Sequence, residues 1–200
     1  MQLLIGTNNA GKVTEIRECL ATLPVELLTP DDLETSIGPP EETGSTYAEN
    51  AVQKAKHYFD CTGIATLADD SGIEVDALAD ELGVRTRRWG AGPAASDEEW
   101  ISYFLERMEK EENRKARFIC QLAYVDAEGN LHRFQGICDG TITSKLEDAY
   151  LSGLPISACF RPNGYNLVYS AMSIEQKNST SHRGKALQKF REHIARSFAH

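Results

Sequence analysis

The positions of the apolar residues along the chain predict an alternation of strands and helices. Two short apolar runs, at residues 3–7 and 25–29, are typical of buried strands. Between them, four apolar residues recur at helical spacing, namely Val13, Ile16, Leu20 and Leu23. Pro24 follows and is expected to end that helix, because proline has no N–H to donate.

Short polar side chains predict where three further helices begin. Thr46 and Ser96 are each followed three residues later by a glutamate, which is the pattern of a capping box. The first of these helices is expected to run to about Phe59. Ser181 is a suitable N-cap for a last helix. The stretch 34–45 is rich in proline and glycine, so it is expected to be a loop.

The remaining patterns complete a sheet. Residues 64–70 predict a buried strand that ends in two carboxylates, and residues 116–125 and 131–143 predict a long antiparallel hairpin. The stretch 144–168 has no regular pattern. We therefore expect a mixed α/β fold in which a single domain, residues 1–200, contains an elongated mixed sheet with flanking helices. Two lobes are expected to surround a central cleft.

Composition and charge narrow the class of protein. Of the 200 residues, 41% are hydrophobic and 26% are charged, as in ordinary globular proteins. The net charge of −9 disfavours a nucleic-acid polymer as partner, because such binding needs a basic face. The five cysteines are never spaced C-x-x-C, and no apolar stretch is long enough for a membrane span or a leader. We expect a cytoplasmic protein with reduced thiols and no membrane partner.

The sequence GTNNAGKV, residues 6–13, has the features of an anion-binding loop. Gly6 and Gly11 let backbone N–H groups approach an anion, and the following helix directs its positive end there. Further donors are available from Thr7, Asn8, Asn9 and Lys12. Val13 stands where a P-loop has the Ser or Thr that holds Mg²⁺, so a Walker-type ATPase is disfavoured. A tight strand-to-helix turn without a ligand explains this pattern equally well.

Two pairs of adjacent carboxylates could bind a hard cation such as Mg²⁺. Glu41 and Glu42 lie in the predicted loop, and Asp69 and Asp70 lie at the predicted strand end, where α/β sheets bind ligands. Neighbouring side chains of a strand point in opposite directions, so one of each pair is the expected ligand. A carboxylate beside the cation could deprotonate or orient a water. The alternative is that both pairs are simply solvated.

Basic residues gather around the predicted start of the last helix. Lys177, His182 and Arg183 surround Ser181, although cations oppose the helix dipole at this end. A bound anion would offset that cost. Lys54 could add a charge to the cleft, although a surface lysine is the simpler interpretation. Groups suited to phosphates and groups suited to Mg²⁺ in one chain suggest a hydrolase that acts on a polyphosphate.

Five segments of the chain, taken together, indicate a protein family far more specifically than any single motif does. They read TNNAGK, EETGSTYAENAVQKAK, LADDSGIEVDAL, GVRTRRWGAG and EQKNSTSHRGKAL. In this order and spacing, from Leu4 to about Leu187, the chain resembles the inosine triphosphate pyrophosphatase (ITPase) family. That family cleaves nucleoside triphosphates to the monophosphate and pyrophosphate and clears deaminated purine nucleotides. The resemblance implies a two-lobed α/β fold with an interlobe cleft, Mg²⁺ as cofactor and a homodimer.

The resemblance also implies roles for individual residues. Glu41 is similar to the family's metal ligand, and Asp70 is similar to its metal-binding general base, with Asp69 beside it as a second catalytic carboxylate. Residues similar to substrate-contacting positions are Thr7, Asn8, Asn9, Lys12, Lys54, Ser71, Lys177, His182 and Arg183. On this view the metal lies on the acidic segments, so Val13 does not disturb its binding.

One segment departs from the family pattern. Where the family has Gly-Phe-Gly-Tyr/Trp-Asp-Pro beside the base, this chain has residues 153–158, with Ile156 at the aromatic position and Ser157 at the aspartate. Val168 and Ala171 replace the Thr and Glu of the family's T-x-A-E-L pattern. Losing the stacking contact removes roughly 1 kcal/mol. Losing polar partners can change selectivity by orders of magnitude. Ile156 and Ser157 are therefore expected to contact the base with an altered preference.

The leading hypothesis is an Mg²⁺-dependent nucleoside-triphosphate pyrophosphohydrolase. Its expected substrates are non-standard purine nucleotides such as ITP, dITP and XTP, with altered or relaxed base preference. One alternative is a catalytically weak nucleotide-binding or regulatory protein on the same scaffold. Another is a pyrophosphatase for a different modified nucleotide.

Overall fold

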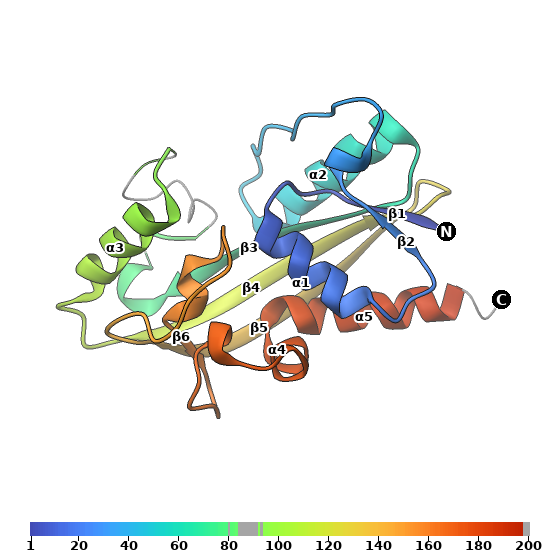
Figure 1. Cartoon of the computed structure of the whole chain (residues 1–200). Coiled ribbons are helices and arrows are strands. Elements are labelled where there is room, and N and C mark those ends of the chain that lie inside the picture. The colour runs from blue at the N-terminus through green and yellow to red at the C-terminus, as the bar shows by residue number, and fades with distance from the viewer. Residues whose placement is uncertain (80, 84–91, 93, 198–200) are drawn as a thin grey trace.

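A mixed sheet of six strands runs through the described part of the computed structural model (Figure 1). The structure describes residues 1–79, 81–83, 92 and 94–197. The strand order is β2-β1-β3-β4-β5-β6, in which β1 is parallel to β2 and β3 and the other neighbours are antiparallel. The strands are β1 Gln2–Ile5, β2 Glu26–Leu28, β3 Thr66–Val75, β4 Lys115–Val125, β5 Leu131–Ile142 and β6 Phe160–Pro162.

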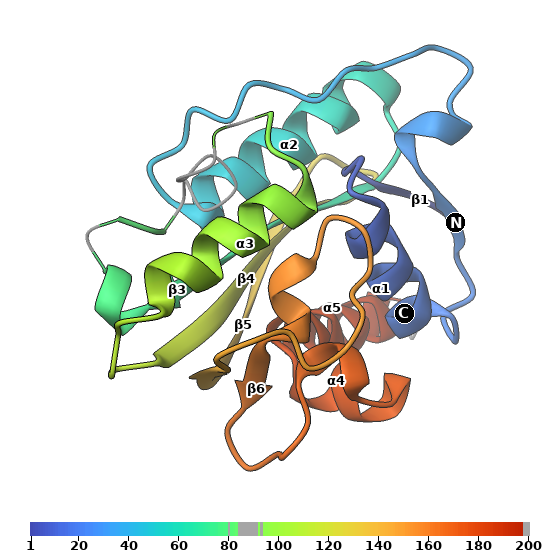
Figure 2. The same ribbon diagram turned by 60° about the vertical axis from the view of Figure 1, so that its left-hand side comes forward.

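Helices cover both faces of this sheet. They are α1 Ala10–Leu20, α2 Tyr47–Thr62, α3 Asp97–Met108, α4 Ile174–Thr180 and α5 His182–Ser197. Helix α2 packs on one face of β3 and β4, and α5 packs on the opposite face with α1 beside it (Figure 1). Helix α3 lies toward the other end of the sheet, as Figure 2 also shows. The two ends of the sheet are the two lobes that the sequence predicts.

The alternation of side chains along β3 and β4 explains this layering. Leu67 and Leu122 face α1 and α5, where they join a core of large apolar residues. Ala68 and Ala123 point the other way, and their small size lets α2 lie close to the sheet. A third cluster, which includes Trp100, fills the lobe around α3. The site described below lies between these clusters.

Several predicted elements are confirmed. The first strand, the long hairpin and the irregular stretch 34–45 lie where the sequence predicts them. Thr46 and Ser96 each accept a hydrogen bond from the backbone N–H three residues later, at the starts of α2 and α3. Only Ser96 forms the predicted capping box, because the Glu49 carboxylate accepts from the backbone N–H of Ser45, one residue before Thr46. Ser181 does the same for Gly184 at the start of α5.

Helix α1 ends at Leu20 rather than beside Pro24, and three other elements also differ from the sequence predictions. Strand β3 does not end at Asp70 but continues to Val75, because β4 pairs with it along that whole length. Helix α4 was not predicted, since this seven-residue helix buries none of its residues and so carries no apolar pattern. The stretch 144–168 contains β6 and a helical turn at Pro155–Ala158.

Among the residues that the structure describes, no helix is both long enough and apolar enough to span a bilayer.

We predict that Gly136→Ala destabilises the protein. Helix α5 crosses β5 so closely that a Cβ at this position would lie 1.9 Å from the carbonyl oxygen of His182 and 2.7 Å from the backbone nitrogen of Ala186. Moving α5 away should cost about 1–3 kcal/mol, measurable by urea denaturation. Gly38→Ala is the matched control, because a Cβ there meets no atom within 4 Å. Equal stability of the two variants would contradict this packing.

Candidate active site

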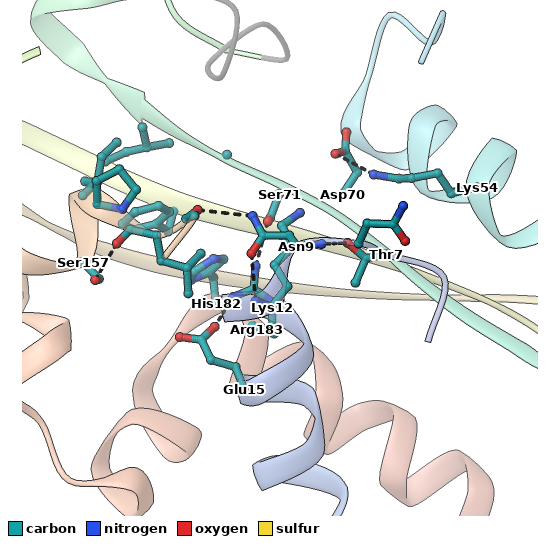
Figure 3. Close-up of a pocket in the computed structure, with 18 of the residues that line it drawn as sticks. Thr7, Asn9, Lys12, Glu15, Lys54, Asp70, Ser71, Ser157, His182 and Arg183 are labelled. Atoms are coloured by element: carbon teal, nitrogen blue, oxygen red, sulfur yellow. Dashed lines mark hydrogen bonds and ion pairs between the residues drawn. The ribbon is translucent and has the colours of Figure 1, made fainter. Parts of the chain in front are cut away.

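A cleft with a volume of about 350 Å³ lies between the two lobes. One end is formed by residues 6–12 and α2, and the other by Trp100 of α3 and residues 153–157. Twelve polar residues line it, namely Thr7, Asn8, Asn9, Lys12, Glu15, Glu42, Lys54, Asp70, Ser71, Ser157, His182 and Arg183. Figure 3 shows that many of these side chains converge on the middle of β3. This convergence makes the cleft the candidate active site.

The loop between β1 and α1 places several donors at one edge of the cleft. Asn9 is the N-cap of α1, because its Oδ1 accepts a hydrogen bond of 3.0 Å from the backbone N–H of Lys12. The backbone N–H of Asn9 donates to Thr7 Oγ1 at 3.2 Å. The N-terminal end of α1 thus faces the cleft, where a helix dipole favours an anion. The predicted phosphate-binding loop therefore has suitable geometry.

On the α2 side of β3, two carboxylates share one ammonium group. Lys54 Nζ donates to Asp70 Oδ1 at 3.1 Å and to Glu42 Oε1 at 3.0 Å (Figure 3). Asn50 Nδ2 donates to the other oxygen of Asp70 at 3.1 Å. The simpler interpretation of Lys54 as a surface lysine is wrong, because its exposed fraction is 7%. Glu42 and Asp70 are thus the carboxylates of the cleft that face a common cation position.

On the opposite side of β3, Asp69 is wholly buried and paired with two cations. Its side chain is 0% exposed and forms ion pairs with Lys12 of α1 and with Arg183 of α5, the latter at 3.1 Å. Cys120 Sγ donates to the same carboxylate at 3.3 Å. Burial raises the pKa of Asp69, but Arg183, Lys12 and Lys54 outweigh it and hold that pKa far below its usual range. Asp69 is therefore a permanent anion beneath the cleft.

Glu15, on α1, is a site residue that the sequence analysis missed. Its carboxylate forms an ion pair with Arg183 of α5 (Figure 3) and another with Lys177 of α4, and the residue is 7% exposed. Arg183 also donates to Ser71 Oγ at 2.9 Å. The basic residues around the start of α5 were expected to need a bound anion. Glu15 and Asp69 of the protein itself supply part of that negative charge.

Asp70 and His182 have pKa values that suit different tasks. Burial raises the pKa of Asp70 above its ordinary value, and Lys54 and Lys12 only partly offset it. A carboxylate with a raised pKa is a better proton acceptor. Burial and the nearby Arg183 lower the pKa of His182 well below its usual range. The His182 imidazole is therefore neutral at neutral pH and adds no positive charge to the basic cluster.

The other end of the cleft is mainly apolar. Ile156 and Ser157 are buried in the helical turn that follows Leu154, and the Ser157 hydroxyl donates to the Leu154 carbonyl at 2.6 Å. The ring of Phe118 stacks on His182, with centroids 4.6 Å apart and planes 16° apart. Phe118 also stacks on Tyr169, with ring centroids 5.6 Å apart. Planar rings and aliphatic side chains thus form a surface on which a flat group could pack.

The structure brings most of the predicted residues to the cleft, but not all. Glu41 is exposed and does not line the cleft, whereas its neighbour Glu42 does. Asp69 and Lys177 do not line the cleft. They form ion pairs with residues that do, namely Lys12, Arg183 and Glu15. Most of the segment GVRTRRWGAG, residues 84–91, lies outside the described residues. Two ring residues that the sequence analysis did not name, Trp100 and Phe118, also line the cleft.

Comparison with known proteins gives matches along nearly the whole chain. The sequence family described as the Ham1 family matches residues 3–193. A dITP/XTP pyrophosphatase of Leptospira interrogans is 44% identical over 186 residues, which cover 93% of each chain. The solved structure of a HAM1 protein from Coxiella burnetii has a TM-score of 0.82 and 30% identity, covering 98% of this chain and 99% of that one. The Staphylococcus aureus Ham1 protein has a TM-score of 0.80 and 27% identity, covering 98% and 100%.

We predict that Asp69→Asn costs about 3–5 kcal/mol of stability at neutral pH, because it leaves Lys12 and Arg183 without their shared counter-charge. The folded pKa of Asp69 lies below its ordinary value of 3.8, so the native carboxylate stabilises the fold above that pH and loses this effect as the pH falls through the folded pKa. Urea denaturation at several pH values should show the deficit of the variant shrinking below pH 3.8. The exposed Asp60→Asn is the control. A deficit independent of pH would contradict the assignment.

Proposed function

Because this chain belongs to the Ham1 family, we propose that it hydrolyses nucleoside triphosphates to the monophosphate and pyrophosphate. Its proposed substrates are non-standard purine nucleotides such as dITP, ITP and XTP, in line with the names of its relatives. We further propose a single functional domain, Mg²⁺ as the cofactor, a homodimer, and a place in the cytoplasm. The free state of all five cysteines supports a reducing compartment.

The observation that carries this proposal is the position of Asp70. It lies in the cleft between the phosphate-binding loop on one side and Lys54 on the other, and its raised pKa suits a proton acceptor. A triphosphate held at the N-terminal end of α1 would place its phosphates beside this carboxylate. A nucleotide-binding protein without activity would not need a carboxylate with these properties.

The donor set of the cleft fits a hard divalent cation. Glu42 and Asp70 both lie within 3.1 Å of Lys54 Nζ, so two carboxylates already face one positively charged position. Within the described residues no third carboxylate, cysteine or histidine joins them in a metal-binding cluster. Mg²⁺ commonly takes one or two carboxylates and completes its shell with water and substrate phosphates. Bound there, it would neutralise charge on the phosphate oxygens.

The proposed step is attack of a water molecule on the α-phosphorus. Asp70 accepts a proton from that water, whose oxygen forms a new bond to the α-phosphorus. The bond from the α-phosphorus to the α,β-bridging oxygen breaks, and that oxygen leaves with the pyrophosphate. Lys12 and Arg183 reach the lining of the cleft and stabilise the charge that develops on the phosphates. Ser71, held by Arg183, is placed to contact the substrate.

The base is proposed to pack between Ile156 and the rings at the apolar end of the cleft. The Ser157 hydroxyl already donates to the Leu154 carbonyl, so it offers an acceptor but not a free donor to a base. A neutral His182 can offer only one ring N–H. These few polar groups support an altered or relaxed base preference rather than a stringent one.

We predict that the purified protein with Mg²⁺ releases pyrophosphate from dITP, ITP or XTP. Asp70→Asn should reduce kcat by about 10²- to 10⁴-fold, because the proton acceptor is lost. In the native protein, kcat should fall at low pH once Asp70 is protonated, since protonation removes the same acceptor. Hydrolysis in ¹⁸O-labelled water should place the label in the monophosphate. Binding without turnover across a panel of common, deaminated and other modified triphosphates would contradict the proposal and favour a regulatory protein.

A matched pair of variants tests which glutamate serves the metal. The resemblance assigns Glu41, whereas the geometry favours Glu42, because only its carboxylate meets Lys54 beside Asp70. We predict that Glu42→Gln raises the Mg²⁺ concentration needed for half-maximal turnover and that Glu41→Gln leaves it close to the native value. A metal titration of both variants at saturating substrate measures this. The reverse result would return the ligand role to Glu41.

A further inference from the structure

The side chain of Asn9 is shared between the phosphate-binding loop and the segment that faces the base. Its Oδ1 accepts the bond from the backbone of Lys12 that begins α1, and its Nδ2 donates to the carbonyl oxygen of Gly153 at 3.3 Å. A carboxamide is planar, so these two bonds have a fixed relation to each other. A change in the position of the loop must therefore change the bond to Gly153.

The two segments are also in direct van der Waals contact. We call residues 152–157 the strap. A Cβ on Gly11 would lie 2.7 Å from the carbonyl oxygen of Ser152 and 2.8 Å from the side chain of Leu154. Gly153 has a φ of +81°, and a Cβ there would lie 2.6 Å from Nδ2 of Asn9. Glycine is thus required on both sides of the contact, and the strap fits closely on the loop.

The strap is tethered to the other lobe as well. The backbone N–H of Gly153 donates to Oδ2 of Asp97, in the first turn of α3, at 2.5 Å. From Gly153 the chain continues through Leu154 to Ile156 and Ser157, which line the apolar end of the cleft. The peptide groups of Gly153 therefore connect α1, α3 and the residues that face the base.

We propose that Asn9 is a positioning residue that couples phosphate binding to the order of the base-facing strap. The proposal rests on the proposed function, because it requires the loop to bind phosphates. A phosphate held by the loop immobilises Asn9 and with it the bond to Gly153, so the strap becomes less mobile before any base touches it. By thermodynamic reciprocity, a base that packs well against the strap strengthens phosphate binding. Base selectivity would thus depend on a residue at the opposite end of the cleft.

Hydrogen exchange with inorganic tripolyphosphate as the probe tests this coupling, because tripolyphosphate carries no base. In the native protein with Mg²⁺, we expect tripolyphosphate to slow exchange in the peptide covering residues 150–159 by about twofold to tenfold, the size expected for one hydrogen bond. Asn9→Ser should abolish this slowing at saturating tripolyphosphate. Serine remains a good N-cap but has no N–H₂ group to reach Gly153.

Asn8→Ser is the matched control at saturating tripolyphosphate, since Asn8 lies in the same loop and lines the cleft but, within the described part of the chain, forms no hydrogen bond with the strap. It should keep the native slowing. Exchange within β4 checks that each variant is folded, and calorimetry checks that tripolyphosphate binds. Native slowing in Asn9→Ser, or binding without slowing in the native protein, would overturn the coupling alone. Failure of tripolyphosphate to bind the native protein would overturn the phosphate-binding loop and the coupling with it.

Discussion

The ion pair between Asp69 and Arg183 is the interaction on which the rest of the site depends. Both side chains are at least 98% buried, and a charge removed from water to that extent must be paired. Asp69 lies on β3 and Arg183 on α5, and their bond of 3.1 Å fixes that helix against the sheet. Lys12 brings α1 to the same carboxylate, and Glu15 brings α4 to Arg183 through Lys177. Three parts of the chain that are distant in sequence, namely α1, β3 and the consecutive helices α4 and α5, are thus held together by charges that none of them could bury alone.

The extended geometry of β3 gives two adjacent aspartates different roles, one as a fixed anion and the other as a proton acceptor. Successive side chains of a strand point to opposite faces, so Asp69 meets Arg183 while Asp70 meets Lys54. The first carboxylate is paired with Lys12 and with the buried Arg183 and stays ionised, which gives a fixed anion. The second has one ammonium group and access to the cleft, and burial raises its pKa toward the range of a useful base. The difference between them comes from their surroundings and not from their chemistry.

Local signals in the sequence predicted most strands and the helix caps, because those features depend on neighbouring residues, whereas cleft residues such as Ser71, Ile156 and Ser157 were expected only from the family resemblance. The opposite orientation of Asp69 and Asp70 followed from strand geometry alone. Glu15 could not be found in this way, since its ion pair with Arg183 joins residues 168 positions apart and its burial depends on where α5 lies. The extension of β3 past Asp70 was missed because Ser71 and Gly72 resemble a strand end, and only the partner strand β4 shows that pairing continues. Helix α4 carried one usable signal, the capping box from Ser173 to Gln176.

The surroundings of the two neighbouring carboxylates of β3 should make them differ in their protonation. Carbon NMR of the protein labelled at the aspartate carboxyl carbons measures this directly, with Asp69→Asn and Asp70→Asn used to assign the two signals. The account predicts that Asp69 stays ionised at every pH at which the protein is folded, whereas Asp70 titrates with a pKa above its ordinary value of 3.8. Titration of both carboxylates near 3.8 would contradict the account, because neither would then be set apart by its surroundings.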